Sequence, residues 1–360
     1  MRVLGIETSC DETAAAVVVD GRELLSQTIA SQIETHTKFG GVVPEIASRQ
    51  HVQAVTRVVL QTLSEANLTF TDLDAIAVTQ GPGLLGALLV GVSAAKGFAL
   101  ATGLPLLGVH HIAGHVAASF VGTSLQPPFL SLVVSGGHTE LLTVDEHFCF
   151  QTLGATKDDA AGEAYDKVAR LLGLAYPGGP KLDVLAATGN PTAYHFPRSV
   201  LGEGSLDFSY SGLKSAVANV LARQRREGRE VCVADVAASF QTAVVEVLVD
   251  KATMALQQTG LSTLVLAGGV AANQGLRQAL HQQSQKLGFQ LVVPAVELCT
   301  DNGAMIAAAG YWLYKAGRFS NLELNATASL PLVTWQTGMG VDNDEGLLVE
   351  KVELGRISPL

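Results

Sequence analysis

The chain has 360 residues, of which 48% are hydrophobic and 16% charged, and its net charge is −10. This length is sufficient for one large or two medium-sized domains with substantial cores. An acidic chain does not bind nucleic acid through its overall charge, so an RNA substrate would require a local basic patch or a partner protein. The four cysteines are scattered, without CxxC spacing or disulfide density, which fits a reducing, cytoplasmic compartment.

Neither a signal peptide nor a membrane span is expected. The N-terminal sequence MRVLGIETSCDE contains acidic residues too early for the apolar region of a signal peptide. The most apolar stretch, residues 84–103, is rich in small side chains and contains Lys96. This composition favours a packed helix over a membrane-spanning one.

The first half of the chain predicts three strands, a helix, a strand, a helix, a strand and a helix, in that order. These elements cover residues 3–8, 14–20, 23–31, 44–66, 73–83, 84–103, 104–111 and 112–121. The second half repeats the same succession, with strands or helices at 129–137, 138–144, 148–154, about 160–174, 261–273, 289–297 and 302–316, and with a further helix between 273 and 289. The sequence therefore predicts a duplicated β-β-β-α-β-α-β-α unit, with insertions in the second copy.

A duplicated unit of this kind resembles the actin, sugar-kinase and heat-shock chaperone ATPase (ASKHA) superfamily, an α/β fold with a nucleotide cleft between two lobes. We expect an N-terminal lobe over residues 1–125 and a C-terminal lobe over 126–320, with a helical insert at about 160–240. Residues 321–360 lose hydrophobic periodicity and predict a loosely structured tail.

Three turns that follow strands are candidates for binding phosphate, at residues 9–13, 135–139 and 267–273. Glycine and small polar residues let backbone N–H groups approach phosphate oxygens. Each turn alone is weak evidence, but their equivalent places in the duplicated unit favour a nucleotide cleft. Neither GxxxxGK[ST] nor GxGxxG occurs, which argues against P-loop and Rossmann binding.

Asp11 and Glu12 lie in the first of these turns. A carboxylate beside a phosphate repels it unless the carboxylate meets a metal, a water molecule or a proton. We therefore treat both residues as candidate catalytic groups, acting in proton transfer or in positioning a cation. Solvated turn carboxylates are the simpler alternative.

His111 and His115 are four residues apart and would share one face of a helix, close enough to bind one ion. An HExxH zinc peptidase requires a glutamate after the first histidine, where this chain has Ile112. A metalloprotease is therefore disfavoured. In the duplicated unit the counterpart of His111 is the segment around Asp301, so this carboxylate is the expected third ligand, although it could also cap a helix.

Asp166 and Asp183 flank the sequence YPGGP (176–180), which interrupts a helical stretch. Taken alone they read as surface acids. Inside a cleft they could accept hydrogen bonds from hydroxyl or ammonium groups.

The combined motifs resemble the TsaD family, which makes threonylcarbamoyladenosine in tRNA and was formerly described as O-sialoglycoprotein endopeptidase. The resemblance covers roughly residues 1–320. It is carried by GIETSCDET (5–13), GGVVPEIASRQH (40–51), QGPGLLGAL (80–88), GVHHIAGH (108–115), VSGGHTEL (134–141), DDAAGEAYDKVARLLGLAYPGGP (158–180), FSYSGLK (208–214), AGGVAAN (267–273) and TDNGAM (300–305).

The resemblance implies a transferase that moves the threonylcarbamoyl group of threonylcarbamoyl-AMP to N6 of adenine 37 in tRNA and releases AMP. It implies an iron site, with zinc as an alternative, at His111, His115 and Asp301. Substrate binding is implied for Val134, Ser135, Gly136, Gly137, His138, Asp166, Gly179, Asp183 and Asn273. Val133 stands where archaeal and eukaryotic relatives have a tyrosine ligand, so the chain is similar to the bacterial branch, whose partners are TsaB and TsaE.

Two other functions remain open at the level of sequence. A small-molecule kinase or ATPase of the same superfamily would transfer phosphate, and the histidine pair has no evident role in that chemistry. A non-catalytic, partner-binding paralogue would be expected to lack the set of two histidines and an aspartate, which is intact here.

Overall fold

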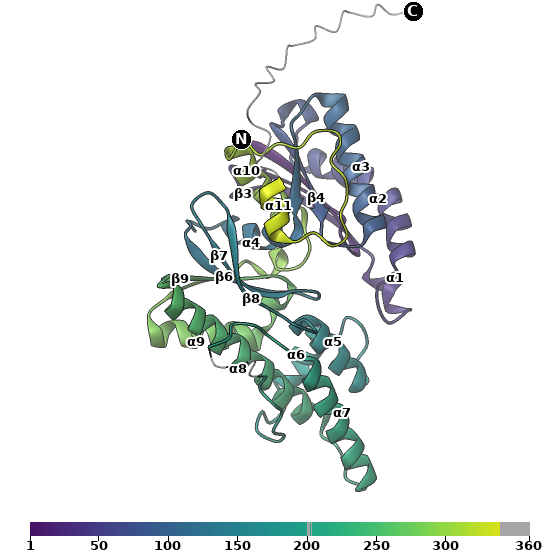
Figure 1. Ribbon diagram of the computed structural model, residues 1–360. Coiled ribbons are helices and arrows are strands. Elements are labelled where there is room, and N and C mark those ends of the chain that lie inside the picture. The colour runs from purple at the N-terminus through teal and green to yellow at the C-terminus, as the bar shows by residue number, and fades with distance from the viewer. Residues whose placement is uncertain (200–201, 203, 339–360) are drawn as a thin grey trace, which may run out of the picture.

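The computed structural model describes residues 1–199, 202 and 204–338 and contains two five-stranded sheets (Figure 1). The strand orders are β3-β2-β1-β4-β5 in the first sheet and β8-β7-β6-β9-β10 in the second. In each sheet the first three strands are antiparallel neighbours and the remaining strands run parallel to the first. The predicted duplication is therefore confirmed, because both halves have one topology.

The first sheet and its helices come from the first 120 residues. The strands are β1 (Arg2–Glu7), β2 (Glu12–Val19), β3 (Glu23–Ser31), β4 (Ala75–Gly81) and β5 (Leu106–His110). The helices are α1 (Ile33–Thr37), α2 (Pro44–Glu65), α3 (Leu85–Thr102) and α4 (His111–Ala117). Alternate residues of β1 face opposite sides, so Leu4 and Ile6 pack under α2 and α3 while Val3 faces the other lobe.

The second sheet contains β6 (Phe129–Val134), β7 (Thr139–Val144), β8 (Phe150–Ala155), β9 (Thr263–Ala267) and β10 (Gln290–Val292). Its helices are α5 (Ala161–Leu171), α6 (Gly178–Ala186), α7 (Ser211–Arg226), α8 (Val233–Thr259) and α9 (Gln274–Leu287). Leu130 and Leu132 of β6 pack against helices of this lobe, and Phe129 and Val133 point back toward the first lobe. Strand β10 is shorter than the predicted strand at 289–297, since a 3₁₀ turn occupies Val296–Leu298.

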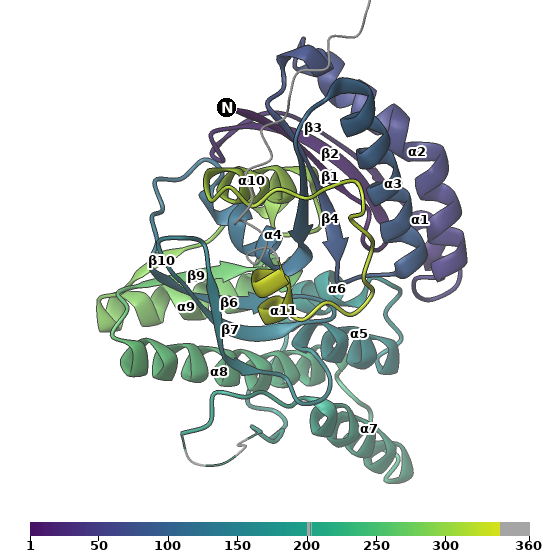
Figure 2. The same ribbon diagram turned by 45° about the horizontal axis from the view of Figure 1, so that its top comes forward.

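A third core lies between the two sheets and holds the lobes together (Figure 2). It is built from α4 and from α10 (Gly303–Lys315), with inward-facing residues of both sheets. Helix α10 packs on β1, β2 and β4 of the first sheet, although it follows the second sheet in sequence. Helix α10 thus lies within the range expected for the C-terminal lobe, 126–320, and covers the sheet of the N-terminal lobe.

Two glycines explain how α10 comes so close to the first sheet. A Cβ atom on Gly5 of β1 would stand 2.3 Å from the backbone nitrogen of Ala307, and one on Gly303 would stand 2.3 Å from the backbone of Ala15. Neither position tolerates a side chain without movement of backbone. The contact fixes the start of α10, and with it the residues that immediately precede the helix.

Residues 321–338 are packed, which corrects the expectation of a loose tail for this part; residues 339–360 lie outside the described residues. Leu324 and Ala326 join the core under α2 and α3, and Trp335 of α11 (Leu332–Gly338) joins the core between the sheets. The indole of Trp335 donates to the carbonyl of Gly108 over 2.9 Å. This segment therefore links the end of the chain to the strand that leads into α4.

The apolar stretch at 84–103 forms α3, as predicted for a packed helix. By length and composition it is the one helix among the described residues that could cross a membrane. In the structure it lies beside α2 on the outer face of the first sheet, where Leu88, Val92 and Ala95 are buried.

Candidate functional site

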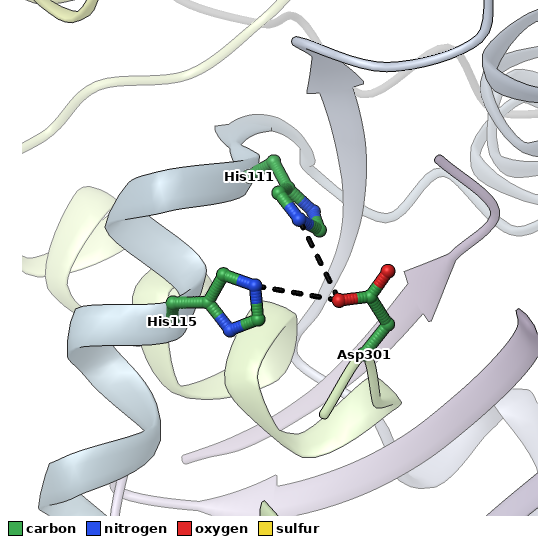
Figure 3. A group of neighbouring side chains, drawn as sticks. All are labelled: His111, His115 and Asp301. Carbon is green, nitrogen blue, oxygen red and sulfur yellow. Dashed lines mark ion pairs between the residues drawn. The ribbon is translucent and has the colours of Figure 1, made fainter. Parts of the chain in front are cut away.

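Two histidines and an aspartate meet at the junction of the lobes (Figure 3). His111 opens α4, and His115 lies one turn further along the same face. Asp301 precedes α10, and its Oδ1 lies 3.6 Å from Nε2 of His111 and 3.3 Å from Nε2 of His115. Ligand atoms about 2.1 Å from a tetrahedral ion are separated by about 3.4 Å, so the spacing fits one ion.

The state of His115 also fits a metal ligand. This side chain is 1% exposed, and neither ring nitrogen has a hydrogen-bond partner among the described residues. A buried, unpartnered imidazole is costly unless another group satisfies its nitrogens. A divalent ion bound at Nε2 would satisfy one of them.

Negative charge dominates the surroundings of the histidines. Burial alone would lower the pKa of His111, but the carboxylates of Asp301 and Glu7 outweigh it and raise this pKa to about 9. Burial would raise the pKa of Asp301, and the facing histidines instead hold it at about 2. The arrangement therefore favours a cation, either a proton on His111 or a metal ion in its place.

Glu7, at the end of β1, orients the His111 ring through Nδ1, the nitrogen that does not face Asp301. Its carboxylate is completely buried and accepts hydrogen bonds from the backbone N–H of Ser9 and from Oγ1 of Thr79. Nδ1 of His111 lies 3.3 Å from Oε2 of Glu7, so this nitrogen is placed to donate and Nε2 is left to face Asp301. Such a carboxylate–histidine pair fixes the tautomer that binds a metal. Sequence reasoning missed Glu7, because it read as part of an apolar strand.

Asp11 lies in the turn between β1 and β2, and Glu12 is the first residue of β2, beside this centre. Burial, with smaller contributions from Asp11 and Asp301, raises the pKa of Glu12 to about 7. One carboxylate oxygen of Glu12 accepts a hydrogen bond from Ser31 over 2.8 Å, and the other is buried and has no hydrogen-bond partner within the described part of the chain. Burial is also the main cause that raises the pKa of Asp11. Glu12 is thus suited to proton transfer near neutral pH, and Asp11 is a second candidate whose pKa is shifted in the same direction.

The turn from Ser135 to His138 is the counterpart of this turn in the second lobe. The backbone N–H and hydroxyl of Ser135 exchange hydrogen bonds with the backbone of His138. A Cβ atom on Gly136 or Gly137 would meet nothing within 4 Å, so open space lies over the turn. Burial, with smaller contributions from the neighbouring His111 and His115, lowers the pKa of His138 to about 4, which keeps its ring neutral.

The turn after β9 is adjacent to this one. Gly268 has a φ of +89°, and a Cβ atom there would lie 2.5 Å from the carbonyl oxygen of Val134. Glycine is thus required where the two turns touch. The structure brings together two of the three turns predicted to bind phosphate.

The remaining predicted binding residues form two hydrogen-bonded groups in the second lobe. Asp166 accepts from the backbone N–H groups of Gly178 and Gly179. Asp183 accepts from Gln241, whose side-chain oxygen in turn accepts from Asn273 over 3.0 Å. Asn273 also caps α9. No sequence signal identified Gln241, because it lies within the long helix α8.

The duplicated sheets and the centre between them define a two-lobed protein with the ASKHA fold. Full-length HypF has the same fold, with a TM-score of 0.59 at 15% identity over 87% of this chain and 46% of that protein. Component A of the (R)-2-hydroxyglutaryl-CoA dehydratase of Acidaminococcus fermentans has a TM-score of 0.51 at 18% identity, over 88% and 99% of the two chains.

Sequence comparison gives the family. The family model for tRNA N6-adenosine threonylcarbamoyltransferase, TsaD, matches residues 23–308. Proteins of that name from Geobacillus thermodenitrificans and Bacillus cereus are 58% and 56% identical, and the alignments cover 92% of this chain and 97% and 96% of theirs. The chain belongs to the TsaD family of transferases, as the motifs predicted.

Proposed function

We propose that this chain transfers the threonylcarbamoyl group of threonylcarbamoyl-AMP to N6 of adenine 37, in tRNAs that read codons beginning with adenine. The observation that carries the proposal is the buried pair of histidines facing Asp301, beside the carboxylate of Glu12, in a chain of this family. The products are AMP and a tRNA that carries N6-threonylcarbamoyladenosine.

In the proposed reaction, N6 of adenine attacks the carbamoyl carbon and forms a new C–N bond. The bond from this carbon to the phosphate oxygen breaks, and AMP leaves with the electron pair. The proton from N6 passes to Glu12, since an acceptor with a pKa of about 7 is suited to proton transfer at neutral pH. Asp11 is the alternative acceptor, or a group that positions a cation.

The second lobe is proposed to hold the adenylate. The open turn at Ser135, Gly136 and Gly137 offers backbone N–H groups to an anion, and Val134 supports this turn from β6. Neutral His138 can donate a hydrogen bond to the substrate without adding charge. The groups around Asp166 with Gly179, and around Asp183 with Asn273, are proposed to accept hydrogen bonds from ribose or threonyl hydroxyls.

Iron, or alternatively zinc, is the proposed ion, held by His111, His115 and Asp301. When bound, it would act as a Lewis acid that polarises a substrate oxygen. Glu7 keeps Nε2 of His111 available for it.

We further propose a cytoplasmic protein that works with TsaB-like and TsaE-like partners. The net charge of −10 supports a need for partners, because tRNA is not attracted by the chain as a whole.

The test is reconstitution of the purified chain with threonylcarbamoyl-AMP and tRNA, with and without the partner proteins, followed by mass analysis of the nucleosides. We expect one threonylcarbamoyladenosine per tRNA and one AMP. A matched reaction with ATP and small-molecule alcohols or acids tests for kinase activity. Phosphoryl transfer without any tRNA modification would contradict the proposal.

A further inference from the structure

Helix α7 extends away from the rest of the second lobe (Figure 1). Only Leu213 and Val217, both in its first half, are buried. Sixteen residues at 1.5 Å each give a rod of about 24 Å, so its later turns project beyond the core. Val220 and Leu221 still pack against the core of this lobe, so the last turn, which follows them, is the candidate contact surface.

The base of α7 is fixed close to the proposed adenylate turn. The carboxylate of Asp158 accepts hydrogen bonds from the hydroxyl and backbone N–H groups of Ser209, Tyr210 and Ser211, and these bonds hold its pKa at about 2 although burial would raise it. Asp158 is four residues before Gly162 of α5, where an added Cβ atom would lie 2.4 Å from the carbonyl oxygen of Ser135. The helix therefore starts close to the turn that is proposed to hold the adenylate.

The free end of α7 is basic in an acidic protein. Residues 211–230 hold five of the 23 lysines and arginines of the chain and only two acids. The side chains of Arg223, Arg225 and Arg226 are exposed, and none of them forms an ion pair with the described residues. Arg229 does, with Glu227 at 3.1 Å.

The helix dipole explains part of this pattern but not all of it. Cations in the last turn of a helix contribute about 0.3–1 kcal/mol, and one or two suffice for that effect. Arg223 and Arg226 are three residues apart and share one face of the helix, where two like charges repel each other, and an intramolecular role does not require that cost. Clustered arginines without partners are instead typical of surfaces that bind phosphate groups.

We infer that Arg223, Arg225 and Arg226 contact the phosphate backbone of the anticodon stem while the adenine beside the anticodon lies in the cleft. The inference rests on the proposed function, because it takes tRNA as the substrate. A helix that starts near the proposed adenylate turn and carries these arginines about 18–23 Å along its axis can reach the stem of an RNA whose loop enters the site. Contact with phosphates positions the RNA and carries no sequence preference.

The experiment compares the full-length chain with Arg223→Gln/Arg225→Gln/Arg226→Gln, together with the partner proteins that support transfer. Glutamine preserves helix propensity, so the variant should fold. We expect tRNA affinity to fall roughly tenfold or more at low salt, and the slope of log K against log salt to decrease by about one per arginine in contact. Affinity for AMP and metal content should not change.

The matched control is Lys286→Gln/Lys315→Gln, which removes two exposed charges at the ends of α9 and α10. We expect the control to bind tRNA within about twofold of the parent. Parental tRNA affinity and salt slope in the triple variant would overturn the inference, and so would lost modification at unchanged RNA affinity, which would assign α7 to a protein partner. Failure of the proposed function would differ, because the parent itself would then modify no tRNA.

Discussion

The turn after the first strand of each lobe occupies the same place in the topology, yet the two turns differ in chemistry. In the first lobe the turn and the start of β2 carry Asp11 and Glu12, whose partly buried carboxylates have raised pKa values. In the second lobe the equivalent turn carries Gly136 and Gly137 under open space. The same topology thus provides carboxylate side chains in the first lobe and exposed glycine backbone in the second lobe.

This difference suggests a division of labour between the lobes. Bare backbone N–H groups suit an anion, and partly buried carboxylates near a histidine pair suit a cation and a proton. The first lobe, extended by Asp301 and α10, is therefore proposed to do the chemistry, and the second lobe is proposed to bind the adenylate. Variants on the two sides should separate the two functions.

The largest effect is expected from removing the histidine pair on the side of the first lobe. Purified parent should carry about one divalent ion per chain, and His111→Ala/His115→Ala should carry almost none, because two of three ligands are gone. Elemental analysis by mass spectrometry measures this directly. Full metal content in the double variant would show that the ion binds elsewhere.

The next effect is expected at Glu12. Removal of the proton acceptor in Glu12→Gln should slow single-turnover transfer to tRNA about 100-fold or more. Affinity for the adenylate should hold or increase, since a charge that repels the phosphate is lost. We expect a weaker effect in Asp11→Asn. Parental transfer rates in both variants would show that these two carboxylates have a structural role and that another group accepts the proton.

The pH dependence gives an independent check on Glu12. Only its ionised form accepts a proton, and its pKa is raised to about 7. Below pH 7 the transfer rate of the parent should therefore rise about tenfold per pH unit, and it should level off above pH 7. In Glu12→Gln this inflection should disappear while residual activity remains measurable.

A smaller effect is expected at Glu7, which touches the centre only through His111. In Glu7→Gln the amide can donate to Nδ1 and favour the tautomer whose Nε2 carries the proton, so the metal should bind 10–100-fold more weakly. Competition with a chelator measures this affinity without any need for activity. Glu140→Gln is the control, because it removes a largely buried carboxylate that has no contact with His111 among the described residues.

Much of this arrangement was predictable because its signals are local. Strand periodicity and the turns that follow strands gave the duplicated order of elements, and the duplication placed Asp301 opposite His111 and His115. The cluster around these three residues required no knowledge of tertiary packing beyond that symmetry.

Other features depend on contacts that no local pattern reveals. Helix α10 is apolar on nearly every side, so its sequence does not say which sheet it covers; Gly5 and Gly303 decide that through close approach. The tail looks aperiodic, yet Trp335 and Leu324 anchor it to cores far away in the sequence. Glu7 and Gln241 are single polar residues within regular elements, and only the fold gives them partners.

The smallest effect, and the one that tests the second lobe, is expected at its glycines. A Cβ atom on Gly137 or Gly269 meets nothing within 4 Å, and neither residue has a φ in the left-handed region, so Gly137→Ala and Gly269→Ala should fold normally. If the adenylate lies against this backbone, the added methyl group occupies its space and should weaken AMP binding by a few-fold to about tenfold. Calorimetric titration measures the affinity, and Gly97→Ala on α3, which also meets open space, is the matched control. Metal content should stay at the parental level in all three variants, because the centre is built from α4 and the start of α10. Unchanged AMP affinity in both Gly137→Ala and Gly269→Ala would show that the nucleotide does not bind at these turns. It would also contradict the proposed division of functions between the lobes.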